Sequence, residues 1–346
     1  GAEIAILKDT TAVRETGRPQ CTEIQITGIS MYKNKSVATV VPAYNEELLI
    51  KRVIETMPDY VDYIVIVNDK SKDKTAEIVQ CYVDKSEGRV VLIDLLNRQG
   101  VGGAIAEGYK WCRDHKIDAT AVMAGDAQMD PADLPALLDP IVNDEVDYTK
   151  GNRLVTGEAW EIIPRSRYLG NAMLSLLTKI ASGYWHITDS QSGYTVANLK
   201  VLETIDLDKI YKKYGMPNDL LVKLNIYNFR VRDVEIKPIY GIGEKSGIKP
   251  FLVIPRFSWL LLRLFFYRMV QKYIIRDFHP LIFFYFISGL LNTAGVVLLV
   301  RMIVYWIQNG HIPPINALAA FFSLTLGIQM LLFAMWFDMD SNKRLR

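Results

Sequence analysis

Polar and acidic side chains follow three short apolar segments of the sequence, and their types suit the binding of phosphate oxygens through a divalent cation. The segments Val40–Glu47, Asn68–Thr75 and Met123–Pro131 read VVPAYNEE, NDKSKDKT and MAGDAQMDP. Carboxylate and amide oxygens are ligands that Mg²⁺ and Mn²⁺ prefer, and such an ion completes its shell with phosphate oxygens. The residues that could do this chemistry are Tyr44, Glu46, Asp69, Asp126 and Gln128.

The elements that must position these residues are predicted from the hydrophobic pattern. Four short apolar segments are separated by segments of helical pattern. They are Val37–Val41, Tyr63–Val67, Val90–Ile93 and Ala119–Met123. This alternation predicts an α/β fold, in which a mostly parallel sheet carries helices on both faces. Ligands bind such sheets beyond the carboxyl ends of the strands, so we expect the polar residues to gather at that edge.

A glycine cluster precedes one of the predicted helices. Asn97–Tyr109 reads NRQGVGGAIAEGY and places three glycines where a loop enters the helix. Glycine lets the backbone approach a ligand closely, and a helix N-terminus attracts an anion. Gly100 is therefore a candidate binding residue, although helix packing explains the same glycines equally well.

Two long uncharged segments near the end of the chain predict a membrane hairpin. Leu281–Val300 and Ile315–Phe337 contain no charged residue, and a helix of about 20 residues crosses a hydrocarbon core ~30 Å thick. We expect transmembrane helices over 281–307 and 315–337, joined by a short turn. The alternative is a buried helical pair in a soluble domain, but such helices rarely lack a polar stripe over this length.

Flanking charges predict how the hairpin is oriented. Both ends of the hairpin are basic, and the connector carries no Lys or Arg, so the positive-inside rule places both termini and the α/β domain in the cytoplasm. We expect 256–280 to form an amphipathic helix in the membrane interface, with one basic face toward anionic lipid head groups. The alternative is a connector packed on the soluble domain. The flanking cations are Arg256, Arg263, Arg268, Lys272, Arg276, Lys343, Arg344 and Arg346.

Composition limits the class of protein. The chain has 346 residues, 50% of them hydrophobic, and its 40 Lys+Arg nearly balance 38 Asp+Glu, which gives no sign of a nucleic-acid partner or of disorder. Three cysteines are too few for a disulfide framework. The expected domains are an N-terminal extension (1–35), an α/β domain (36–255), a juxtamembrane helix (256–280), two spans (281–307, 315–337) and a basic cytoplasmic tail (338–346).

VVPAYNEE together with GDAQMDP resembles the family 2 glycosyltransferases, and within them the membrane-anchored polyprenyl-phosphate (dolichyl-phosphate) hexosyltransferases. The resemblance covers 36–250, and the two spans match anchored members. It implies a Rossmann-like GT-A fold, a nucleotide-sugar donor and Mg²⁺ or Mn²⁺. It implies that Asp126 and Gln128 hold the metal on the donor diphosphate. The residues that it implies for the nucleotide are Pro42, Ala43, Tyr44, Glu46 and Asp69.

The metal motif departs from the family at one position. The family usually carries an acidic residue two places before the Asp that matches Asp126, and this chain has Ala124 there. One oxygen ligand is therefore missing, which predicts weaker metal binding or an additional water ligand.

Downstream motifs resemble the phosphate and acceptor side of the same family. GNRLVTG makes Arg153 a candidate catalytic and phosphate-binding residue, and Arg165 matches a second phosphate-facing position. TDSQSGYTV resembles the Asp-x-x-Ser-Gly acceptor motif, which implies a catalytic role for Asp189. Each has a structural alternative: a solvated surface arginine, or a turn or helix-cap role for the aspartate.

YGIGEKSGIKP (Tyr240–Pro250) resembles the family's mobile loop that closes over the phosphates. The resemblance implies that Lys245 covers the donor diphosphate and that Ser246 and Lys249 bind the acceptor phosphate. The family often has an arginine shortly before this point, and the lysines here supply point charges without its fork geometry.

The implied reaction transfers one hexose from a UDP- or GDP-sugar to a polyprenyl phosphate at the cytoplasmic face, with inversion at the anomeric carbon. The acceptor phosphate is already anionic, so Asp189 would orient it or act as a weak base. Three alternatives are another lipid acceptor, a processive polysaccharide synthase whose Gln-x-x-Arg-Trp motif is missing here, and a non-catalytic nucleotide-sugar-binding scaffold. Membrane lipids are expected partners, and small residues in the spans are compatible with a homo-oligomer.

Overall fold

The computed structural model describes residues 31–154, 165–237 and 250–346. The predicted loop residues Lys245, Ser246 and Lys249 lie outside the described residues, and so does most of the predicted N-terminal extension. Arg165 begins a described helix, but its side chain is not among the described parts.

The described part of the α/β domain is built on a seven-stranded sheet in the order β3-β2-β1-β4-β6-β5-β7. β1, β2, β3 and β4 pair in parallel, as the sequence predicted, whereas β6 runs antiparallel to β4 and β5. β7 runs parallel to β5 at the sheet edge. The strands are β1 (Val37–Ala43), β2 (Tyr63–Asn68), β3 (Val90–Asp94), β4 (Ala119–Val122), β5 (Tyr148–Asn152), β6 (Thr195–Asn198) and β7 (Val231–Glu235).

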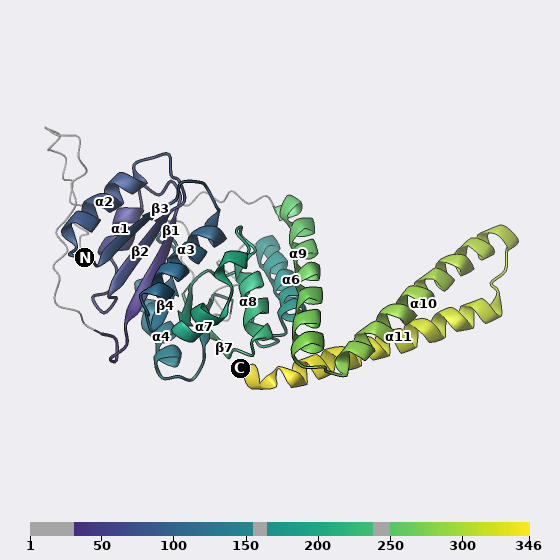
Figure 1. Cartoon of the computed structure of the whole chain (residues 1–346). Coiled ribbons are helices and arrows are strands. Elements are labelled where there is room, and N and C mark those ends of the chain that lie inside the picture. Colours follow the sequence, from purple (N-terminus) through teal and green to yellow (C-terminus); the bar gives the residue numbers. More distant parts are fainter. Residues whose placement is uncertain (1–30, 155–164, 238–249) are drawn as a thin grey trace, which may run out of the picture.

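Helices cover both faces of this sheet, and the sheet separates the core into two layers (Figure 1). Val40 points into the layer under α3, α7 and α8, while its neighbour Val41 points into the layer under α1, α2 and α4. Burial on both faces explains why the strands read as continuous apolar segments. The helices are α1 (Ile50–Glu55), α2 (Thr75–Lys85), α3 (Val101–Asp114), α4 (Leu134–Val142), α6 (Arg165–Ser182), α7 (Leu199–Thr204) and α8 (Met216–Ile226).

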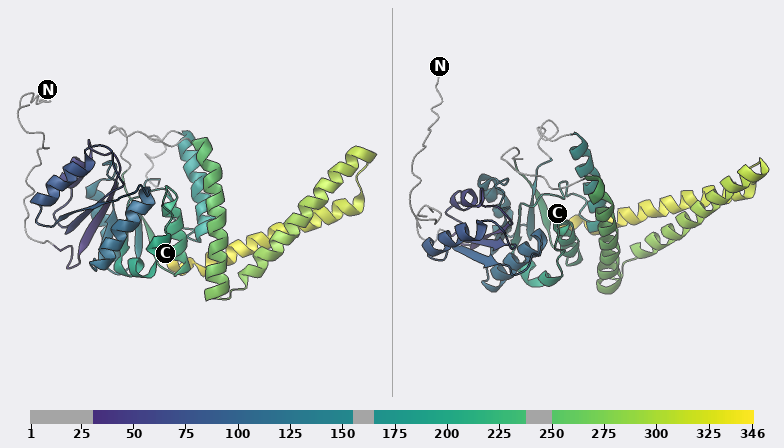
Figure 2. Two further views of the ribbon diagram at one scale, coloured as in Figure 1. Left: turned by 45° about the horizontal axis from the view of Figure 1, so that its top comes forward. Right: turned by 90° about the horizontal axis from the view of Figure 1, so that it is seen from above.

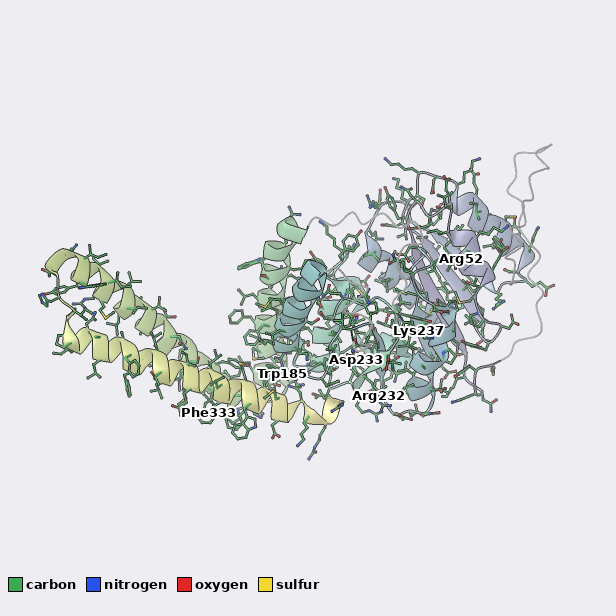
Figure 3. All side chains as sticks on the ribbon, turned by 180° about the vertical axis from the view of Figure 1, so that it is seen from behind. Arg52, Trp185, Arg232, Asp233, Lys237 and Phe333 are labelled. Atoms are coloured by element: carbon green, nitrogen blue, oxygen red, sulfur yellow. The ribbon has the colours of Figure 1, made fainter. Side chains whose placement is uncertain are left out.

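Two long helices, α10 (Leu281–Asn309) and α11 (Pro314–Ser341), form an antiparallel hairpin that projects away from the α/β domain (Figures 1 and 2). In each, a window of 18 residues has a mean hydropathy of 2.0, and the helix is long and apolar enough to cross a membrane. Small residues bring them together: a Cβ on Gly295 would lie 2.7 Å from Leu324 Cγ. Phe333 lies on this hairpin, while Arg52 and Arg232 lie on the α/β domain (Figure 3).

Helix α9 (Pro250–Val270) continues into a π-helical turn, Gln271–Arg276, and connects the α/β domain to the hairpin. It packs beside α6 at the side of the domain from which the hairpin leaves (Figure 2). The outer surfaces of these two helices expose large apolar side chains, and Trp259 is 70% exposed. The other exposed apolar residues include Met173, Leu176, Leu262 and Phe266.

The sequence spacing of four residues puts Arg268, Lys272 and Arg276 on one basic face of this connector. The prediction that this face meets lipid head groups is wrong for Arg268 and Lys272. Arg268 and Lys272 are only 0% and 6% exposed, and they contact Asp338 and Asn225 inside the protein. Arg276 lies over the ring of Tyr227. The one-face spacing was correct, but that face packs on the protein because hydrogen-bond acceptors and a carboxylate are available there.

Two further features were not predicted. The segment 338–346 docks on the α/β domain, because Leu345 is buried in the core layer under α3, α7 and α8. Three cysteines were predicted to be too few for a disulfide framework, and this stands, but the prediction did not include a single bond: Cys81 on α2 is disulfide-bonded, while Cys112 is a buried free thiol.

Candidate active site at the carboxyl edge of the sheet

Backbone hydrogen bonds tie together the loops that follow β1, β2 and β4. The Asp69 N–H donates to the Ala43 carbonyl at 2.9 Å, and the Gly125 N–H donates to the Pro42 carbonyl at 3.3 Å. The Glu46 N–H donates to Thr75 Oγ1 at 2.9 Å. The residues predicted from three separate motifs therefore share one edge of the sheet.

Asp69 holds the glycine-rich loop in place. Its carboxylate is buried and accepts hydrogen bonds from the backbone N–H groups of Gln99 (2.6 Å) and Gly100 (2.8 Å). Gly100 has φ +84°, and a Cβ there would lie 2.5 Å from the Lys212 carbonyl oxygen, so only glycine fits. A direct contact of Asp69 or Gly100 with a nucleotide stays a prediction.

Arg98 is a candidate that the sequence reading missed. Its guanidinium lies over the ring of Tyr44, with Cζ 3.7 Å from the ring centroid, and its Nε lies 3.9 Å from an Asp69 oxygen. An aromatic ring and a guanidinium at a strand end present a surface for a planar base or an anion. The motif NRQG contains Arg98, but the sequence does not reveal which ring the side chain covers.

Negative charge gathers around Asp126. Burial, followed by the charge of Asp126, raises the pKa of Glu46 to about 7. A Cβ on Gly125 would lie 3.2 Å from the Pro42 carbonyl oxygen and 3.5 Å from Glu46 Cγ, so the motif packs directly against the loop that carries Glu46. The Gln128 N–H donates to Asp126 Oδ1 at 3.1 Å. Two carboxylates in mutual repulsion, with an amide oxygen nearby in sequence, fit a divalent cation.

This donor set is small. Among the described residues, no group of three or more His, Cys, Asp and Glu side chains is arranged to hold a metal ion. Ala124 contributes only a backbone N–H, which contacts Met129 Sδ. The fit to a cation therefore depends on Asp126 and Gln128, with Glu46 as the neighbouring carboxylate.

Arg153, which is partly exposed, forms an ion pair with the buried carboxylate of Asp189. Arg153 Nε lies 2.8 Å from Asp189 Oδ2, and its Nη2 lies 3.2 Å from Oδ1. The backbone N–H groups of Arg153 and Gln191 also donate to this carboxylate. Burial alone would raise the pKa of Asp189, but the charge and hydrogen bonds of Arg153 hold it below its usual value. Asp189 thus orients Arg153, and its contact with an acceptor stays a prediction.

Arg153 also lines a surface pocket with Gln128, so the structure brings together two residues predicted from motifs on different strands. Its other polar lining residues include Asp130, Ser192 and Lys237. Gly193 also lines a second, mainly apolar pocket between the start of α3 and the start of α8. The residues of this second pocket include Val101, Ile105, Val122, Gln191, Tyr214 and Met216.

Lys150 lies beneath the Arg153 ion pair, and the sequence reading did not select it. It is fully buried in β5, and its Nζ donates to the Ser192 carbonyl. Burial lowers its pKa to about 8, although the negative charges of Asp189 and Asp233 act to raise it. Asp233 Oδ2 accepts from Asn152 at 2.8 Å (Figure 3 labels Asp233). β5 reads YTKGN, so the polar sequence of the strand gave no signal that this lysine is buried.

These features define a glycosyltransferase of the GT-A fold, and comparisons with known proteins agree. The family model described as Glycosyl transferase family 2 matches residues 38–206. A UDP-N-acetylglucosamine–dolichyl-phosphate N-acetylglucosaminyltransferase of Methanococcus voltae is 30% identical over 237 residues, which cover 63% of this chain and 94% of that protein. The chain belongs to glycosyl transferase family 2.

Two further comparisons give lower identities. An undecaprenyl-phosphate mannosyltransferase of Micrococcus luteus is 29% identical over 222 residues, covering 61% of this chain and 88% of that protein. The solved glucosyl-3-phosphoglycerate synthase of Mycobacterium tuberculosis is 18% identical, covers 68% of this chain and 80% of that chain, and has a TM-score of 0.48.

Proposed function

We propose that this glycosyltransferase moves one hexose from a UDP- or GDP-sugar to the phosphate of a polyprenol, with inversion at the anomeric carbon. The observation that carries the proposal is the union of a family 2 domain with two apolar helices long enough to cross a membrane. The relatives from Methanococcus voltae and Micrococcus luteus are named as transferases acting on dolichyl and undecaprenyl phosphate. A polyprenyl chain remains in the bilayer, so a membrane hairpin would keep the enzyme beside its acceptor.

A divalent metal, Mg²⁺ or Mn²⁺, belongs to this proposal. Asp126 and Gln128 would hold it, and the charge concentrated around Asp126 and Glu46 supports a cation there. When bound, the metal supplies positive charge that stabilises the departing nucleoside diphosphate. With Ala124 in place of an acidic residue, we expect weaker metal binding than in relatives that carry that carboxylate.

The side chains of the site provide binding and orientation. Tyr44 and Arg98 would bind the nucleotide base together with Pro42, Ala43 and the loop that Asp69 holds. Arg153, fixed by Asp189, would bind a phosphate with its guanidinium. The acceptor phosphate is anionic near neutral pH and needs no strong base. By the same family resemblance, Lys245 would bind the donor diphosphate, and Arg165, Ser246 and Lys249 would bind the acceptor phosphate.

The membrane would hold the enzyme at the height of its acceptor. The exposed apolar side chains of α6 and α9, such as Met173, Trp259 and Phe266, suit insertion into the interface of the leaflet. The positive-inside rule favours a cytoplasmic location for the α/β domain and both termini. Another lipid acceptor and a non-catalytic nucleotide-sugar-binding scaffold are the alternatives, the second favoured only by Ala124.

A partition assay on the full chain tests the proposal. Purified protein receives polyprenyl phosphate in vesicles, Mg²⁺ or Mn²⁺, and radiolabelled UDP-N-acetylglucosamine, UDP-glucose or GDP-mannose in separate reactions. We expect label to enter the organic phase with one donor only, and the UDP-N-acetylglucosamine reaction comes first because of the Methanococcus voltae relative. Chelation of the metal should stop transfer.

Variants of two carboxylates complete this test. Asp126→Ala should reduce transfer at least about 100-fold, because it removes a ligand of the charge-stabilising metal. Glu77→Ala, at an exposed position on α2, is the matched control and should transfer at the wild-type rate. Nucleotide binding without transfer to any lipid phosphate would instead identify a non-catalytic scaffold.

A further inference from the structure

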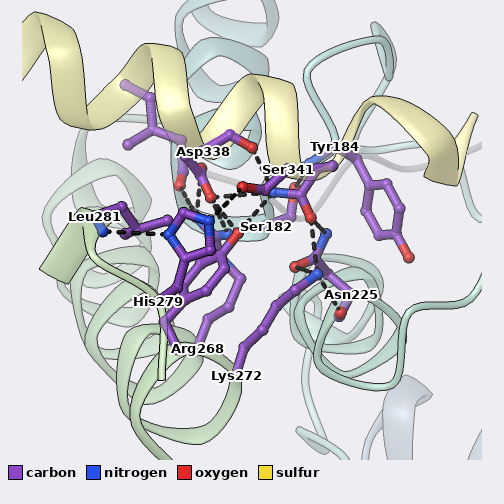
Figure 4. Close-up of polar contacts among 12 residues, drawn as sticks. Ser182, Tyr184, Asn225, Arg268, Lys272, His279, Leu281, Asp338 and Ser341 are labelled. Atoms are coloured by element: carbon purple, nitrogen blue, oxygen red, sulfur yellow. Dashed lines mark hydrogen bonds and ion pairs between the residues drawn. The ribbon is translucent and has the colours of Figure 1, made fainter. Parts of the chain in front are cut away.

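A buried polar cluster joins the hairpin to the α/β domain (Figure 4). We call it the junction cluster, and its members are Asn225, Arg268, Lys272, Tyr273, Asp338 and Asn342. They come from α8, from α9 with the π-helical turn that continues it, and from the end of α11, three separate parts of the sequence. None of these residues belongs to the site at the carboxyl edge of the sheet.

Arg268 binds two elements at once. Its Nη1 and Nη2 donate to the two Asp338 oxygens at 2.7 and 2.9 Å, and both side chains are fully buried. Its Nε donates to the Ala181 carbonyl at 2.8 Å, and its Nη2 also donates to the Ile180 carbonyl at 3.0 Å. One planar guanidinium therefore fixes the end of α11 against the end of α6, because its donors have a fixed geometry.

Lys272 forms a second attachment beside the first. Its Nζ donates to the backbone and side-chain oxygens of Asn225 at 2.9 and 3.0 Å and to Asn342 Oδ1 at 2.8 Å. Asn225 Nδ2 donates to the same Asn342 oxygen at 2.9 Å. Tyr273 Oη donates to Asp338 Oδ1 at 2.7 Å and accepts from Asn342. The hairpin is thus bonded to α8 as well as to α6.

Space around the cluster is tightly filled. Gly183 has φ +78°, and a Cβ there would lie 2.5 Å from Arg268 Nη1. A buried ion pair is weak support for stability, because desolvation of two charges offsets their attraction, but it can specify one arrangement of the parts that it joins. The junction cluster is therefore better suited to orienting the hairpin than to stabilising the fold.

Helix α8 connects this junction to the active site. All of its residues except Pro217 are buried, so it lies in the core between the two regions. Asn225 belongs to the junction, and two turns earlier Asn218 Oδ1 accepts from Thr178 Oγ1 (3.2 Å) and Gln191 Nε2 (3.3 Å). The backbone N–H of Gln191 donates to Asp189, which orients Arg153.

We propose that Arg268 and Asp338 are positioning residues that lock the α/β domain at one angle on its hairpin, so that Arg153 meets a phosphate presented at the membrane surface. The expected effect on transfer rests on the proposed function, whereas the fixed angle between domain and hairpin does not depend on it. It predicts that the pair matters for acceptors embedded in a bilayer and not for acceptors that diffuse freely to the site.

The first experiment uses the double variant Arg268→Met/Asp338→Leu, which replaces the pair without leaving one charge buried. Spin labels at Glu77→Cys on α2 and Ile307→Cys on α10, both exposed, report the distance between domain and hairpin in lipid nanodiscs. We expect one narrow distance distribution in the parent protein and a broad one in the double variant. Arg263→Met, an exposed cation on the same helix, is the control and should keep the narrow distribution. An unchanged distribution in the double variant would overturn the proposal.

The second experiment compares acceptors. Transfer is measured with a long polyprenyl phosphate in vesicles and with a short, water-soluble prenyl phosphate. The double variant should lose about tenfold to 100-fold in kcat/KM with the long acceptor, the scale expected for misplacement of reacting groups, and little with the short one. Equal losses with both acceptors would assign the pair a merely structural role. If the parent protein transfers to neither acceptor, the proposed function fails. The spin-label distances then still test whether Arg268 and Asp338 fix the angle of the domain on the hairpin.

Discussion

Arg153 illustrates what a motif can and cannot predict about a single residue. The sequence placed Arg153 and Asp189 in two separate motifs, and the structure brings both to one site with a 2.8 Å contact. It did not predict that the carboxylate would be fully buried and engaged by Arg153. Likewise, nothing local indicated that Arg98 covers Tyr44. Pairing of side chains depends on which strands and loops become neighbours, and the separation in sequence does not determine this.

Lys150 predicts a pH dependence of stability. Burial lowers its pKa to about 8 from an ordinary value of 10.5, so the unfolded chain holds this proton more tightly than the folded protein. Between about pH 8 and 10.5 the unfolded state therefore binds more protons, and the contribution of Lys150 to the free energy of unfolding rises with pH.

Thermal unfolding of the detergent-solubilised protein between pH 7 and 10 measures this effect. The difference in Tm between wild type and Lys150→Met should shift in favour of wild type as the pH increases. Lys72→Met, at an exposed position, should give a curve parallel to wild type. Parallel curves for the Lys150 variant as well would contradict the lowered pKa.

Local pattern was most informative at the level of elements. The four parallel strands, the helices between them and the two apolar spans were all predicted, because each depends on residues within a short segment. The helix after the domain was predicted over 256–280, and α9 with its π-helical turn occupies Pro250–Arg276. The antiparallel placement of β6 was not predicted, since strand order depends on contacts between distant segments.

The close packing of α3 on β1 makes a second prediction. A Cβ on Gly108 would lie 2.3 Å from Val40 Cγ1, in the core layer of the sheet. Gly108→Ala should therefore reduce the free energy of unfolding by about 1–3 kcal/mol, the usual cost of overpacking a core. Thermal or denaturant unfolding measures it.

A matched glycine provides the control for that substitution. Gly289, inside α10, has no heavy atom within 4 Å of an added Cβ. Gly289→Ala should leave stability unchanged or raise it slightly, because alanine favours a helix more than glycine does. If Gly108→Ala were tolerated as well as the control, α3 would have to lie further from β1 than this close approach to Val40 implies.

At the scale of the whole molecule, the chain leaves the α/β domain through α9, forms the hairpin and returns to the domain. Leu345 packs in the core layer under α3, α7 and α8, so both ends of the hairpin are attached. Two attachments restrict rotation of the domain on the hairpin, which a single connecting helix would permit. This arrangement supports an enzyme held at a fixed orientation to its membrane.

Leu345→Ala tests the returning attachment. Loss of a buried leucine side chain should cost about 2 kcal/mol and increase hydrogen exchange in the backbone of α7 and α8 beside it. Leu318→Ala, on the exposed surface of α11, should leave exchange in those helices unchanged. Equal exchange in both variants would mean that the last residues contribute nothing to the domain.

The sequence by itself determined the α/β fold, the motifs at the strand ends and the two apolar spans, because hydrophobic pattern and strand-end motifs are properties of short segments. Only the tertiary structure decided which charges are paired and buried. Arg268 meets Asp338 across 70 residues, Lys272 meets Asn225 across 47, and Arg153 meets Asp189 across 36. Such partners are set by how helices and strands pack, and burial then decides that a basic face turns into the protein instead of toward lipid.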